Sequence, residues 1–235
     1  LFGDEIAWAA LALLDLDQIV SLPEDARRSR LFCDALSAWT AVAGTDRKNN
    51  FSGSDLLAST APVATPGQLM LILTEIMGLA SQDAAAALRL PLAEALDLAK
   101  TARLDLEQGV TGRVLIIEDE PLIAEGVAML VESLGVEVVA MARSRDQAVA
   151  LAAKHQPDVV LADFDLGGGG TGLDAVKQIS SEMPAVAIFI TAFPDEVLTG
   201  EDYEPTFVLA KPYRERALRT ALAYSLKAPR AELVE

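Results

Sequence analysis

Five short runs of β-branched and aliphatic residues, each followed by an amphipathic stretch, occupy residues 113–228 and constrain the fold more than any other feature. The runs predict strands at 114–117, 136–141, 159–162, 186–190 and 207–210. The stretches predict helices that start near Pro121, Arg145, Thr171, Asp195 and Arg214. Strands joined by crossover helices form a parallel sheet covered on both faces, so this half is predicted to be a five-stranded α/β domain.

The first half of the chain is rich in Ala and Leu at helical spacing. It predicts helices at 4–20, 24–43, 66–77, 82–88 and 92–107. A segment rich in Gly, Ser, Thr, Asn and Pro separates the second helix from the third and predicts a linker with at most one short helix, at 55–58. We therefore expect helical parts at 1–44 and 65–108, a linker at 45–64, the α/β domain at 113–228 and a tail at 229–235. Because the chain begins at Leu1, we also expect that an upstream segment is missing from the first helical part.

The charge of the chain argues against nucleic acid as a partner. There are 35 acidic and 19 basic residues, a formal net charge of -16, and both halves are acidic: -7 over residues 1–112 and -9 over the remainder. Such a chain repels phosphate backbones. No apolar run approaches the roughly 18 residues that span a bilayer, so no membrane association is expected. The single cysteine, Cys33, and the absence of a signal peptide fit the cytoplasm.

Charged and hydroxyl side chains follow the predicted strands at the point where each strand ends. They are Glu118 and Asp119 after the first strand, Asp163 after the third, Thr191 after the fourth and Lys211 after the fifth. Because the carboxyl ends of parallel strands meet at one edge of the sheet, we expect these side chains to converge. Clustered carboxylates favour a hard cation such as Mg²⁺, which would neutralise a phosphoryl group arriving at Asp163. Thr191 and Lys211 could bind its oxygens, so the pattern predicts phosphoryl transfer to a carboxylate.

The stretches RVLIIEDEPLIA, DVVLADFDL, FITAFP and LAKPY, with separations of 44, 28 and 20 residues between Asp119, Asp163, Thr191 and Lys211, resemble a two-component receiver domain. That resemblance implies the flavodoxin-like (βα)5 fold, with Asp163 as the phosphoacceptor. It also implies Mg²⁺ held by Glu118, Asp119, Asp163 and the backbone carbonyl of Asp165. The resemblance further implies a protein that is not an enzyme beyond slow self-dephosphorylation.

Three features of the α/β half need a separate interpretation. Receivers commonly carry an aromatic residue three positions before the lysine, but here that position is Val208, and Phe207 lies one residue earlier. The bulk of Phe193, two residues after Thr191, leads to the hypothesis that it restricts attacking water and prolongs the life of the phosphoryl group. The GGGGTG run at 167–172 lacks the lysine of a phosphate-binding loop, so we expect a flexible loop at the rim of the acidic pocket.

Residues 66–107 predict a helix-turn-helix, with breaks at Gly78 and before Pro91. Their order resembles region 4 of an extracytoplasmic-function sigma factor, and residues 4–43 resemble the remainder of region 2. The last helix carries four acidic residues and only two basic ones, Lys100 and Arg103, so we do not expect it to bind DNA. A sigma-like shape without a sigma-like charge suggests a surface that mimics a sigma factor.

A sigma-like part followed by a receiver resembles the PhyR family of general stress response regulators. The resemblance implies an anti-anti-sigma factor whose receiver, phosphorylated by a separate histidine kinase or phosphotransfer protein, releases an intramolecular interface with the sigma-like part. The freed part would bind a NepR-like anti-sigma factor and so release the sigma factor. Two alternatives stay open: a response regulator that binds DNA through its helix-turn-helix, and an unrelated helical bundle serving in output or dimerisation. An enzyme with its catalytic residues in 1–108 finds no support, because that half has no histidine and no convergent acid or nucleophile motif.

Overall fold

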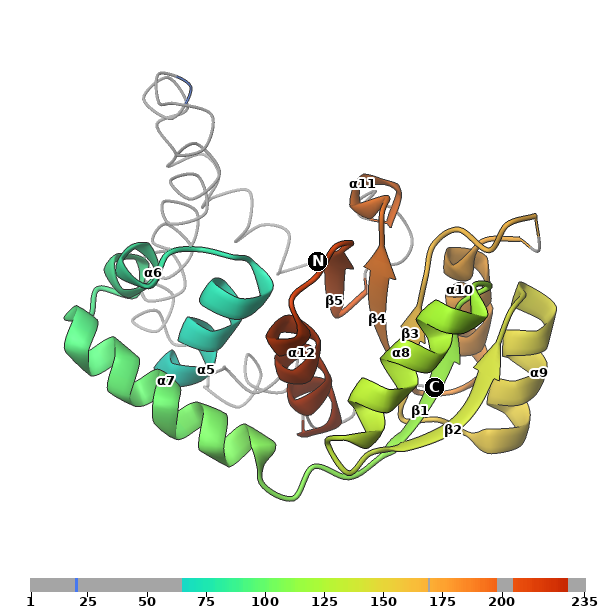
Figure 1. Cartoon of the computed structure of the whole chain (residues 1–235), viewed down its shortest axis with the longest axis horizontal. Helices are drawn as coiled ribbons and strands as arrows, with labels where there is room; N and C mark the ends of the chain where they lie inside the picture. Colours follow the sequence, from blue (N-terminus) through green and yellow to red (C-terminus); the bar gives the residue numbers. More distant parts are fainter. Residues whose placement is uncertain (1–19, 21–64, 169, 198–204, 228–235) are drawn as a thin grey trace, which may run out of the picture. The chain divides into compact units, whose positions relative to one another are not determined.

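The computed structural model describes residues 20, 65–168, 170–197 and 205–227 (Figure 1). The chain divides into two compact units, Leu1–Ala102 and Arg103–Glu235. The helices expected at 4–20 and 24–43 lie outside the described residues, apart from the helical Val20. The expected linker at 45–64, with its short helix, and the tail at 229–235 also lie outside them. The five-part division of the chain therefore stays a prediction.

The described part of the first half is helical, as expected. Its elements are α5 (Pro66–Leu71), the π-helical turn η1 (Ile72–Ile76), α6 (Ser81–Ala87) and α7 (Leu92–Glu107). The uniform helix predicted at 66–77 differs in its second half, where the Met77 amide donates to the Ile72 carbonyl, five residues back. The Thr74 hydroxyl donates to the Met70 carbonyl at 2.7 Å and so competes for the oxygen that a regular α-helical turn would use.

Small residues bring α5 and α7 together. The buried face of α7 includes Ala95, Ala99 and Ala102, spaced four and three residues apart as one helical stripe requires. In α5, Gly67 lies so close to α7 that an added Cβ would be 2.4 Å from the Leu98 carbonyl oxygen. The packing of these two helices therefore depends on the absence of side-chain atoms.

The described residues of the second unit form a five-stranded parallel sheet, which confirms the predicted fold class. The strands are β1 (Arg113–Ile117), β2 (Glu137–Ala142), β3 (Val159–Ala162), β4 (Val186–Thr191) and β5 (Phe207–Ala210), in the order β2-β1-β3-β4-β5. The helices are α8 (Pro121–Glu132), α9 (Arg145–His155), α10 (Gly172–Glu182), α11 (Pro194–Val197) and α12 (Glu215–Lys227). Helices α9 and α10 cover one face of the sheet, and α8 and α12 cover the other (Figure 1).

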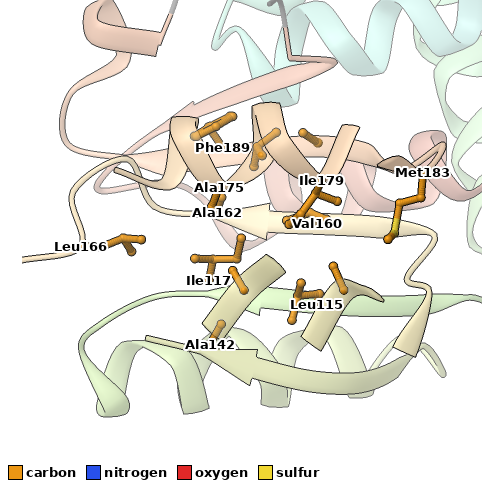
Figure 2. Packing of buried hydrophobic residues seen from close by; sticks show 14 of the residues in the cluster. Leu115, Ile117, Ala142, Val160, Ala162, Leu166, Ala175, Ile179, Met183 and Phe189 are labelled. Carbon is orange, nitrogen blue, oxygen red and sulfur yellow. The ribbon is translucent and has the colours of Figure 1, made fainter. Parts of the chain in front are cut away.

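Aliphatic side chains from alternate positions of the strands form the core beneath α9 and α10 (Figure 2). Leu115 and Ile117 of β1, Val160 of β3 and Phe189 of β4 are all at most 1% exposed in this cluster. Alternation along a strand sends every second side chain to the same face, so the neighbouring residues pack beneath α8 and α12. Among the described residues, no helix is long and apolar enough to cross a bilayer.

Candidate functional site

Backbone hydrogen bonds hold the strand ends of the predicted site in register. The Glu118 amide donates to the Ala142 carbonyl at 2.9 Å, and the Asp163 amide donates to the Ile117 carbonyl at 2.8 Å. The Lys211 amide donates to the Thr191 carbonyl at 2.8 Å. Glu118, Asp163 and Lys211 thus each directly follow the last residue of a strand, and the sheet sets the distances between them.

The Lys211 ammonium joins two of the predicted carboxylates. Its Nζ lies 2.9 Å from Glu118 Oε2 and 2.6 Å from Asp163 Oδ2. The three side chains are 20%, 5% and 12% exposed for Lys211, Glu118 and Asp163 respectively. A partly buried ammonium between two carboxylates neutralises charges that would otherwise repel each other at this edge.

The pKa directions of this group follow from burial and pairing. Burial raises the pKa of the Glu118 carboxyl above its ordinary value, although Lys211 acts in the opposite direction. Burial alone would lower the pKa of Lys211, but its hydrogen bonds and Coulomb attraction to Asp163 and Glu118 outweigh burial and raise it. The Lys211 side chain therefore carries its positive charge at neutral pH.

Both oxygens of the Asp163 carboxylate are engaged. Oδ2 accepts from Lys211, and Oδ1 accepts from the Phe164 amide at 2.6 Å. The side chain is fixed next to the end of β3, and its two oxygens have different partners.

Thr191 is fully buried at the end of β4, and its Oγ1 accepts from the Phe193 amide at 3.0 Å. Because that bond uses the hydroxyl as an acceptor, the hydroxyl proton stays available to a ligand oxygen. The Phe193 side chain is 48% exposed. The structure thus brings Glu118, Asp163 and Lys211 into contact, whereas Thr191 bonds to its own loop.

Asp119 and Asp165 lie against the glycine-rich loop. Gly167 approaches Asp119 so closely that an added Cβ would lie 2.6 Å from Oδ2. The Asp165 side chain accepts from the Gly167 amide at 3.0 Å, and its backbone pairs with Thr171 in an antiparallel bridge. The sequence predicted a flexible rim here and missed the close approach of Gly167 to Asp119. The signal was present in the run of glycines directly after Asp163, which we interpreted only as flexibility.

The donor set fits a hard divalent cation in its chemistry. Glu118, Asp119 and Asp163 offer carboxylate oxygens, and Asp165 offers a carbonyl oxygen, which are the ligands that Mg²⁺ prefers. Within the part of the chain that the structure describes, no group of three or more acidic, His or Cys side chains is arranged to hold a metal ion. The Lys211 ammonium instead contacts the two carboxylates that a cation would share.

The aromatic residue near the lysine faces away from the position expected for receivers. Phe207 packs edge-on against Tyr224 of α12, with ring centroids 5.7 Å apart and an interplanar angle of 83°. Val208 points to the other face and packs against the cluster beneath α9 and α10. A shift of one residue along a strand moves a side chain to the opposite face, so Phe207 cannot take the place that Val208 fills.

Comparison with known proteins gives matches over the whole chain. The response regulator receiver domain model matches residues 114–223. The phyllosphere-induced regulator PhyR of Methylorubrum extorquens is 33% identical over 233 residues, which cover 96% of this chain and 87% of that protein. The sequence similarity thus includes the helical half as well as the receiver.

Two solved structures are similar to the chain along nearly its full length. The response regulator PhyR from Brucella abortus has a TM-score of 0.73 at 34% identity, covering 95% of this chain and 83% of that one. The anti-anti-sigma factor PhyR from Bartonella quintana has a TM-score of 0.73 at 30% identity, covering 95% and 85%.

Proposed function

The chain belongs to the PhyR family of response regulators, and from this premise we propose that a phosphoryl group on Asp163 switches it to a state that binds an anti-sigma factor. The protein is an anti-anti-sigma response regulator with a receiver domain. The observation that carries the proposal is the contact of Lys211 with both Glu118 and Asp163 at the carboxyl edge of the sheet.

Phosphoryl transfer forms one bond and breaks another. A carboxylate oxygen of Asp163 bonds to phosphorus while the phosphorus–nitrogen bond of a phosphohistidine donor breaks, and the histidine nitrogen leaves. Oδ1 accepts from the Phe164 amide and Oδ2 from Lys211, so each oxygen keeps a lone pair with which it can attack phosphorus. Lys211 has a long, flexible side chain and can follow the new charge onto a phosphoryl oxygen while it keeps Glu118.

Two other groups complete the proposed site. Thr191 donates its hydroxyl proton to a phosphoryl oxygen, because its Oγ1 already accepts from the Phe193 amide. Glu118, Asp119, Asp163 and the Asp165 carbonyl would hold Mg²⁺, which would supply positive charge to offset that of the phosphoryl oxygens. The chain's own turnover is at most slow hydrolysis of the acyl phosphate, and the exposed Phe193 limits the approach of water.

The partner that we propose is a NepR-like anti-sigma factor, bound by the sigma-like helices. The unphosphorylated receiver covers that surface, and phosphorylation by a histidine kinase or phosphotransfer protein weakens the cover. Moving the molecule from 1:99 to 99:1 open requires roughly 5.5 kcal/mol in total from phosphorylation and partner binding. Each event favours the other, because their coupling is reciprocal. Sequestering the anti-sigma factor frees a sigma factor for stress transcription, in the cytoplasm.

Direct DNA binding is the less favoured function. Helix α7, the expected recognition helix, carries acidic side chains at Glu94, Asp97, Asp105 and Glu107. A helix that reads the major groove offers Arg and Lys to phosphates and guanine instead. The relatives named as anti-anti-sigma factors agree with this conclusion.

The test uses the purified full chain with MgCl₂ and beryllofluoride, and measures binding of a purified NepR-like anti-sigma factor by calorimetry. We expect beryllofluoride to tighten binding by at least tenfold. Asp163→Asn should abolish this response. After incubation with acetyl phosphate, intact-mass spectrometry of the Asp163→Asn variant should show no added phosphoryl group.

The matched control is Asp146→Asn, at an exposed position in the first turn of α9 that the proposed site does not use. This variant should therefore respond to beryllofluoride as the unchanged chain does. Equal binding with and without beryllofluoride in the unchanged chain, or an unaltered response in Asp163→Asn, would refute the proposed switch.

A further inference from the structure

We propose that Gly167 and Gly172 are positioning residues that set the places of the Asp119 and Asp163 groups. This inference deepens the proposed function and rests on it. The residues that flank the glycine run are anchored. Leu166 is 2% exposed within the core cluster, and the Gly172 amide donates to the Phe164 carbonyl at 2.8 Å.

The closure of the loop continues into α10. Asp165 and Thr171 pair across the loop, and the Thr171 Oγ1 caps α10 by accepting from the Asp174 amide at 3.1 Å. The Asp165 carbonyl, a proposed metal ligand, therefore lies on a segment fixed at both ends. A loop that is closed in this way can hold a ligand oxygen in one place.

At Gly172 the constraint is space beneath the phosphoacceptor. An added Cβ would lie 1.8 Å from the Asp163 carbonyl oxygen and 2.9 Å from its carbonyl carbon. Any side chain here has to push the backbone that carries Asp163. Glycine at this position lets the start of α10 lie directly against the end of β3.

At Gly167 the constraint acts on a side chain. The residue has φ +57, a left-handed conformation, and an added Cβ would lie 2.6 Å from Asp119 Oδ2. The Asp119 carboxylate can rotate away from such a group, so the substitution should displace this carboxylate and leave the fold intact. Because outer groups that orient metal ligands typically contribute tenfold or more to affinity, the displaced carboxylate should weaken Mg²⁺ binding.

The neighbouring Gly168 provides a matched control. It also has a left-handed φ, +95, but an added Cβ meets no atom within 4 Å. Gly167→Ala and Gly168→Ala therefore both place a side chain on left-handed backbone in one loop, and only the first should displace Asp119. Strain alone would affect both variants.

The experiment titrates MgCl₂ into each full-length chain and follows amide NMR shifts of the receiver, with thermal unfolding measured alongside. We expect Gly167→Ala to weaken Mg²⁺ affinity about tenfold or more and to shift the Asp119 amide resonance before any Mg²⁺ is added. Gly168→Ala should keep the affinity within twofold. Gly172→Ala should shift the Asp163 amide resonance, and a folded Gly172→Ala chain in which that resonance is unchanged would overturn the role of Gly172.

The proposal is overturned if Gly167→Ala binds Mg²⁺ like the unchanged chain, or if Gly168→Ala loses as much affinity. Those results leave the proposed function standing, because the unchanged chain still binds Mg²⁺ and responds to beryllofluoride. If the unchanged chain binds no Mg²⁺, both the positioning role and the proposed phosphorylation site fail together.

Discussion

The helical part and the receiver use opposite kinds of side chain to hold their elements together. In the helical part, α5 and α7 meet through Gly67 and a stripe of alanines, so close approach is the source of the packing. In the receiver, the core beneath α9 and α10 is filled by larger side chains, such as Leu115, Ile179 and Phe189, packed among alanines. The two contacts should therefore fail in opposite ways: the contact of α5 with α7 when an atom is added, and the core beneath α9 and α10 when atoms are removed.

The largest expected effect is in the receiver core. Phe189 is 0% exposed, and Phe189→Ala should lower the free energy of unfolding by about 3–5 kcal/mol, the cost of a lost phenyl ring and its cavity. Urea unfolding followed by circular dichroism, with residue-resolved hydrogen exchange, would measure it. The control is Phe193→Ala, at a 48% exposed position, which should stay within about 0.5 kcal/mol of the unchanged chain. Similar losses for both variants would contradict the packing described for the core.

The next effect tests the helical part by adding a single methyl group. Gly67→Ala places a carbon 2.4 Å from the Leu98 carbonyl oxygen and 2.9 Å from Ala102 Cβ. Because both are parts of α7, the helices have to separate, at a cost of about 1–3 kcal/mol. Hydrogen exchange of the α7 amides should speed up accordingly. If the exchange of these amides is unchanged, close approach does not hold the two helices.

The same contrast explains what the sequence could predict. The receiver strands followed from their runs of aliphatic residues, and the meeting of Glu118, Asp163 and Lys211 followed because the direction of a parallel strand fixes where its last residue lies. The π-helical turn at Ile72–Ile76 could not be predicted, since periodicity does not distinguish it from an α-helical turn. The contact of Gly167 with Asp119 could not be predicted either. A glycine in a sequence indicates conformational freedom, but it does not show which neighbouring residue leaves no room for a side chain.

The third prediction concerns the site, where charge rather than packing decides. Lys211→Met removes the ammonium that contacts Glu118 at 2.9 Å and Asp163 at 2.6 Å. The freed carboxylates should bind Mg²⁺ about five- to tenfold more tightly, roughly 1–1.4 kcal/mol, because a competing cation is gone. The same variant should respond less to beryllofluoride. Calorimetric titration of MgCl₂ measures the first effect, and weaker binding by Lys211→Met would show that the ammonium does not compete with Mg²⁺.

The smallest expected effect comes from the same glycine-to-alanine substitution made in a helix of the receiver. Gly126 lies within α8, is exposed, and an added Cβ meets no atom within 4 Å. Gly126→Ala should stabilise the receiver by about 0.5–1 kcal/mol, because alanine loses less backbone freedom than glycine when a helix folds. Thermal unfolding with matched hydrogen exchange of α8 gives the sign directly. Opposite signs for the two variants would assign the cost of Gly67→Ala to the contact with α7. If both variants lose stability, the added methyl group destabilises a helix even where it contacts nothing, and close approach to α7 does not explain the effect of Gly67→Ala.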